Sequence, residues 1–110
     1  MNKKQESVKV LEECKKLQLS KANDYRNKNS RIKHIDYMPR GALSIMEMIH
    51  TKTTRLWSLI EACEDNPQHK PNHESIEDTA IDLINYSAFL VAFMRGKIEG
   101  QDTEKDIFNK

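Results

Sequence analysis

Residues 72–97 read NHESIEDTAIDLINYSAFLVAFMRGK, and this stretch decides the fold. Its first half places carboxylates at Glu74, Asp78 and Asp82, one helical turn apart. Its second half, residues 83–94, is apolar at ten of twelve positions, on every face of a helix. Such a helix is buried on several sides, and we expect a second subunit to cover part of it. The apolar run is too short to cross a bilayer.

Two patterns upstream predict two more helices. Val10, Cys14 and Leu17 form an apolar stripe that predicts a helix from about Gln5 to Asn23. A second helix is expected from about Gly41 to Glu64, with an apolar stripe at close to 3.6-residue spacing. That stripe consists of Ala42, Ile45, Ile49, Leu56, Ile60 and Cys63.

Polar segments separate these helices. Residues 26–40 are rich in Asn, Lys, Arg and Ser, which predicts a long basic loop with room for one short helical turn. This loop either covers an anionic ligand or is a surface with non-specific electrostatics. The prolines of segment 65–72 end the second helix. The third helix is expected to begin with Asn72 or Ser75 as its cap and to end at about Lys97.

The chain of 110 residues is short for more than one core, so we predict a single domain over residues 1–110. We expect an all-α fold, a small antiparallel bundle of three main helices. Oligomerisation through helix 75–97, as a dimer or higher homo-oligomer, would complete it. The formal charge of +1 gives no reason to expect nucleic-acid or membrane binding. Cys14 and Cys63 lie in apolar stripes as reduced thiols, and no signal peptide is visible, so we predict a cytoplasmic protein.

The acidic stripe is the first candidate for chemistry. Like charges four residues apart repel on an isolated helix, so a divalent cation or basic side chains should lie beside them. Carboxylates at this spacing suit a magnesium ion that also binds phosphate oxygens. A solvated face at the positive end of the helix dipole explains Glu74 and Asp78 equally well, but it explains Asp82 poorly.

Two basic clusters are the next candidates. Lys21, Asp24 and Tyr25 continue the inward face of the first helix with polar groups, and they are either ligand contacts or an ordinary helix end. In the second helix, Lys52 and Arg55 could neutralise a phosphate ligand or the acidic stripe, or could be solvated surface charges. The sequence contains no Gly-rich phosphate loop, G-x-S-x-G or HExxH motif.

Three motifs therefore follow one another: Lys21-x-x-Asp24-Tyr25, Lys52-x-x-Arg55 and Glu74-Ser-Ile-x-Asp78-Thr-x-x-Asp82-Leu-x-Asn85-Tyr86. Together they resemble the nucleotide modification associated domain family (its first type), small proteins found largely in phages. That family is similar to the MazG-like all-α nucleotide pyrophosphohydrolases. The resemblance covers residues 18–95, and the third motif is its most specific part.

The resemblance implies an oligomeric all-α protein that handles nucleoside phosphates in an infected bacterial cytosol. In MazG-like enzymes, an E-x-x-E pair and an E-x-x-D pair on neighbouring helices hold magnesium. The metal activates water against the bond between the α- and β-phosphates. Asp82 matches the aspartate of the second pair, but Thr79 stands where its glutamate is expected. The first pair is also incomplete, because Glu47 has His50 three residues later.

Three functions remain open. A Mg²⁺-dependent nucleotide pyrophosphohydrolase would use Asp78, Asp82 and Glu74 for catalysis and Asp78, Asp82 and Glu47 as metal ligands. Its substrate-binding residues would be Lys21, Asp24, Tyr25, Lys52, Arg55, Asn85 and Tyr86. A non-catalytic binder would instead pair its carboxylates with Lys52, Arg55 or Lys21. Such a binder would sequester a nucleotide signal in a host–phage conflict or assist base modification. A purely structural helical oligomer would use the same charges in inter-helix salt bridges.

Overall fold

The computed structural model describes residues 5–25, 30–68, 72–105 and 108, without the side chains of residues 23–25 and 72–74. Its contacts divide the chain into two compact units, Met1–Arg31 and Ile32–Lys110. The predicted all-α class is confirmed, because the described residues form α-helices and short 3₁₀ helices and contain no strand. None of the helices in this described part has the length and apolar character needed to span a membrane.

The first unit contains one helix, α1, from Glu6 to Tyr25. It begins and ends within two residues of the predicted bounds. Glu6 lies in its first turn, where a negative charge interacts favourably with the helix dipole.

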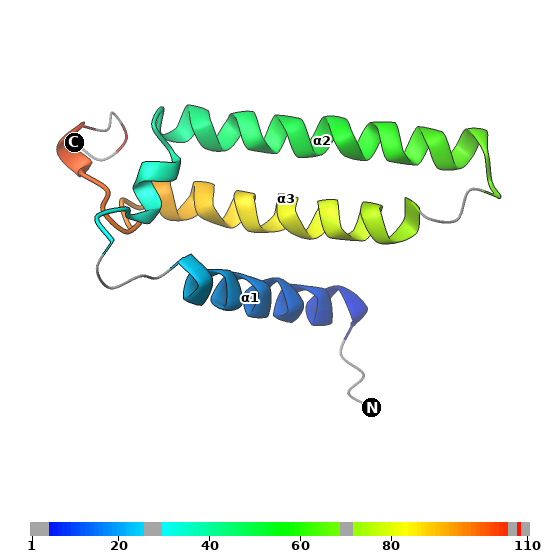
Figure 1. Ribbon diagram of the computed structural model, residues 1–110, viewed down its shortest axis with the longest axis horizontal. Helices are drawn as coiled ribbons and strands as arrows, with labels where there is room; N and C mark the ends of the chain where they lie inside the picture. The colour runs from blue at the N-terminus through cyan, green and yellow to red at the C-terminus, as the bar shows by residue number, and fades with distance from the viewer. Residues whose placement is uncertain (1–4, 26–29, 69–71, 106–107, 109–110) are drawn as a thin grey trace. The chain divides into compact units, whose positions relative to one another are not determined.

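The second unit contains a pair of antiparallel helices, α2 (Ala42–Asp65) and α3 (Asn72–Met94). They lie side by side, as Figure 1 shows in green and yellow. Two 3₁₀ helices flank the pair, η1 (His34–Tyr37) and η2 (Thr103–Lys105). The η1 helix is the short helical turn predicted within the basic loop.

The buried side of α2 differs from the predicted stripe at its C-terminal half. Ile60 is 42% exposed, although it was expected on the apolar face. The buried and half-buried positions instead follow alternating steps of three and four residues, as in helices that pack at a small angle. The positions on this spacing are Ala42, Ile45, Ile49, Lys52, Leu56, Leu59 and Cys63, and Ser44 and Thr53 are also half-buried. A 3.5-residue spacing therefore brings Lys52 to the inward face and moves Ile60 off it.

Helix α3 ends at Met94, three residues before the predicted end. Gly96 has φ of +71°, in the left-handed region that favours glycine. The N–H of Gly96 donates to the carbonyl of Phe93 (2.9 Å), and the N–H of Lys97 donates to the carbonyl of Ala92 (3.0 Å). This pair of hydrogen bonds is the Schellman motif that closes many helices.

The small apolar core lies where α2 begins and α3 ends. Met38, Ile45, Phe93 and Ile98 are its buried members. The segment after α3 is held against this core, since the N–H of Ile35 donates to the carbonyl of Glu99 (3.0 Å). The opposite half of the helix pair has no comparable apolar cluster among the described residues, and its inward positions are partly polar.

Candidate functional site

An ion pair joins the predicted acidic and basic motifs across the two helices. The Nζ atom of Lys52 lies 3.2 Å from Oδ2 of Asp82. Their side chains are only 22% and 29% exposed, so the pair is shielded from solvent more than a surface salt bridge. Asp82 therefore meets a basic side chain of α2, which is the arrangement expected both of a pocket built without a metal and of a structural inter-helix salt bridge.

A second polar contact lies about one turn away, between Arg55 and Thr79. The Nε–H of Arg55 donates to Oγ1 of Thr79 at 3.2 Å. The Thr79 hydroxyl in turn donates to the carbonyl of Ser75 at 2.7 Å. Thr79 is only 4% exposed, and its hydroxyl has both hydrogen-bond partners it needs.

The other predicted carboxylates whose side chains are described, Glu47 and Asp78, have different surroundings from Asp82. Glu47 forms an ion pair with Arg40, and Asp78 is exposed. The side chain of Glu74 lies outside the described residues. Within the described part of the chain, no three His, Cys, Asp or Glu side chains lie close enough together to hold a metal ion. The described carboxylates thus do not form a ligand set of three, and bound magnesium stays a prediction.

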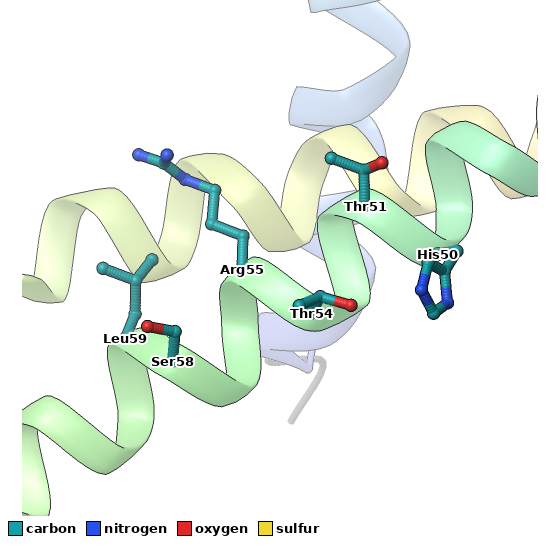
Figure 2. Close-up of a pocket in the computed structure, with 6 residues that line it drawn as sticks. All are labelled: His50, Thr51, Thr54, Arg55, Ser58 and Leu59. Atoms are coloured by element: carbon teal, nitrogen blue, oxygen red, sulfur yellow. The ribbon is translucent and has the colours of Figure 1, made fainter.

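A groove runs along the face of α2 beside this seam, with a volume of about 440 Å³. Figure 2 shows its lining side chains leaving α2, with Arg55 reaching toward α3. The described lining residues are His50, Thr51, Thr54, Arg55, Ser58 and Leu59. They span ten residues of helix, about 14 Å along its axis.

The groove is chemically suited to an anion. Its described lining contains hydroxyl groups, an imidazole and a guanidinium, and no carboxylate. The Thr51 hydroxyl is used within α2, where it donates to the carbonyl of Glu47 at 3.0 Å. The Nε of Arg55 is held by Thr79, which leaves its terminal nitrogens for the groove. Arginine presents these nitrogens in a planar fork that matches phosphate and carboxylate oxygens.

A larger hollow of about 700 Å³ lies at the other end of the helix pair. Its walls are mainly apolar, as are those of the α2 groove, but its charged residues already have partners. Arg40 pairs with Glu47, and Lys105 lies 3.9 Å from Asp102. Its described lining contains none of the predicted site residues, so we place the candidate site at the α2 groove.

The remaining predicted binding residues lie elsewhere. Asn85 is buried in α3, with 7% of its surface exposed. Tyr86 is half-buried, with its ring edge-on to Phe89 at 5.8 Å between centroids. Lys21 is exposed on α1, in the other unit of the chain. The side chains of Asp24 and Tyr25 lie outside the described residues.

Thr79 and the groove hydroxyls of Thr54 and Ser58 were not predicted as site residues. Thr54 and Ser58 are four residues apart, so their positions on one polar face were visible in the sequence. Thr79 carried a weaker signal. It lies three residues before Asp82, on the same side of α3. Its role depends on its contact with Arg55 of α2, which the sequence alone does not show.

Comparison with models of known protein families, with characterised proteins and with solved structures finds no match for this chain. The resemblance noted from the three motifs therefore remains a hypothesis that rests on those residues alone.

Proposed function

We propose that this chain binds nucleoside phosphates, with the phosphate in the α2 groove against Arg55. The observation that carries the proposal is the seam between the helices. There Lys52 pairs with Asp82, and Thr79 holds Arg55 by its Nε. Two of the three motifs that resemble a nucleotide-handling family thus meet, next to a groove whose described lining lacks carboxylates.

The geometry favours binding over metal-dependent hydrolysis. Hydrolysis by a bound magnesium ion needs carboxylates that converge on one point and an activated water. Here Asp82 is directed to Lys52, and Glu47 is directed to Arg40. Binding without turnover is also the property that a protein needs to sequester a nucleotide signal.

An exposed aromatic side chain of α2, outside the groove lining, favours a nucleoside over a bare phosphate as ligand. Trp57 is 66% exposed and follows Thr54 by three residues, so the two side chains share one side of α2. An exposed indole gives a base a surface for stacking, worth about 1–3 kcal/mol in nucleic-acid complexes. Inorganic pyrophosphate, which has no base, should therefore bind more weakly than a nucleotide.

Calorimetric titration tests the proposal. The panel comprises the ribonucleoside and deoxyribonucleoside triphosphates, cyclic nucleotides and inorganic pyrophosphate, each with magnesium and with EDTA, and the products are followed by chromatography. We expect saturable binding in EDTA without product formation. Magnesium-dependent release of nucleoside monophosphate, abolished in Asp82→Ala, would establish the hydrolase instead. Absence of binding to every panel member would refute both and leave the structural oligomer.

A further inference from the structure

We infer that Thr79 is the positioning residue of the groove, which holds the guanidinium of Arg55 in the orientation that receives an anion. This inference rests on the proposed function, because it assigns a role within the same site. Thr79 lies on α3 and outside the groove lining, so it acts on a ligand only through Arg55.

The Thr79 hydroxyl has little freedom to do anything else. Its proton is given to the carbonyl of Ser75, one turn earlier in the same helix, at 2.7 Å. A hydroxyl oxygen whose proton is committed in this way can only accept a further hydrogen bond. The Nε–H of Arg55 supplies that bond at 3.2 Å. Because Thr79 is buried, water has little access to compete for the same position.

This contact determines how Arg55 meets a ligand. A guanidinium is planar, so fixing Nε also restricts the direction of the two terminal nitrogens. Arg55 itself is exposed and lines the groove, so its terminal nitrogens remain accessible to an anion. A side chain that is ordered before binding loses less conformational freedom when the ligand arrives. Removal of the Thr79 hydroxyl should therefore weaken binding of the anion, although no charge is removed.

The test compares Thr79→Val, which keeps the shape and loses the hydroxyl, with Thr79→Ser, which keeps the hydroxyl. The probes are ATP and inorganic pyrophosphate in EDTA. We expect Thr79→Val to raise Kd about tenfold, as the loss of a hydrogen bond to a charged group would. Thr79→Ser should stay within about twofold of wild type. In an Arg55→Gln background, Thr79→Val should produce no further loss, because its effect acts through Arg55.

A ligand-free measurement separates this inference from the proposed function. The exchange rate of the Arg55 Nε–H with water is followed by ¹⁵N NMR in the free protein. It should be slow in wild type and Thr79→Ser and clearly faster in Thr79→Val. If Thr79→Val does not fold, Thr79→Ala takes its place in both measurements.

The outcomes are distinct. Failure of wild type to bind either probe, or unchanged binding in Arg55→Gln, overturns the proposed function. Unchanged binding in Thr79→Val while Arg55→Gln is weak overturns the positioning role alone. An equal loss from Thr79→Val in both backgrounds would also overturn it, since a purely structural defect does not depend on Arg55. Equal Nε–H exchange in all variants would show that Thr79 does not hold Arg55.

Discussion

A lysine on the inward side of a helix needs a counter-charge, because burial disfavours an isolated ammonium group. Asp82 supplies that charge to Lys52 across the α2–α3 seam. The same contact removes the main reason to assign Asp82 to a metal, since the repulsion within the acidic stripe is relieved by a basic side chain. The role of Asp82 therefore depends on Lys52, its partner on the neighbouring helix.

The Lys52–Asp82 pair should contribute measurably to stability. We expect Lys52→Met to lower the free energy of unfolding by about 1–2 kcal/mol, between the values for exposed and fully buried pairs. Asp82→Asn should do the same, and the double variant should be more stable than the sum of the two losses predicts. Urea denaturation of the four proteins gives the coupling energy. Strictly additive losses would show that the two charges do not interact.

His34 gives a second prediction at the residue scale. Burial lowers the pKa of His34 below its ordinary value, and the nearby Glu99 raises it by a smaller amount. Its ring lies edge-on to Phe89, with 4.8 Å between centroids. Because the folded protein disfavours the protonated ring, its contribution to stability is complete above the unfolded pKa of about 6.5 and decreases as pH falls below it.

Thermal unfolding between pH 8 and pH 5 checks this sign. The wild-type Tm should fall with decreasing pH more steeply than the Tm of His34→Gln, which cannot titrate. The other histidines remain in both proteins and act as an internal control. Parallel curves for the two proteins would contradict the account.

At the scale of the helices, the spacing of buried residues explains what the sequence could and could not reveal. The existence, order and approximate bounds of the three helices followed from apolar periodicity and the loop prolines. Which side of α2 faces inward along its whole length did not follow from the sequence, because spacings of 3.6 and 3.5 residues differ little over two turns. They diverge by the position of Ile60, and the difference also places Lys52 inward. Gly96 marks the end of α3, but the sequence prediction extended the helix past it to Lys97.

Two glycines at helix ends should differ in their tolerance of a side chain. Gly41, just before α2, has φ of +62°, and a Cβ there would lie 3.0 Å from Cζ of Phe93. We expect Gly41→Ala to cost about 2–3 kcal/mol, from backbone strain and displacement of a core ring. Gly96→Ala should cost about 1 kcal/mol, from strain at its φ of +71°. Equal midpoints of urea unfolding for the two variants would refute this explanation.

At the scale of the α2–α3 pair, the apolar core lies at one end and the polar seam lies near the middle. The core surrounds Phe93 and Ile45, and the seam contains Lys52 and Thr79. The location of the site in the middle of α2 was therefore predictable from the basic motif. The α3 residues that contact this site were not predictable, because they depend on the register between α2 and α3. The sequence of one helix does not determine that register. Oligomerisation through helix 75–97 stays a prediction.

The most direct test of the central claim compares two single substitutions in one binding measurement. Arg55→Gln removes the groove cation, and Asp78→Asn removes an exposed carboxylate that only a metal site would need. Lys97→Gln, an exposed change of the same charge outside the groove, is the control. With the tightest-binding nucleotide of the panel, we predict that Arg55→Gln raises Kd about tenfold or more, while Asp78→Asn and Lys97→Gln change it less than about twofold. Loss of magnesium-dependent binding in Asp78→Asn with unchanged binding in Arg55→Gln would contradict the account.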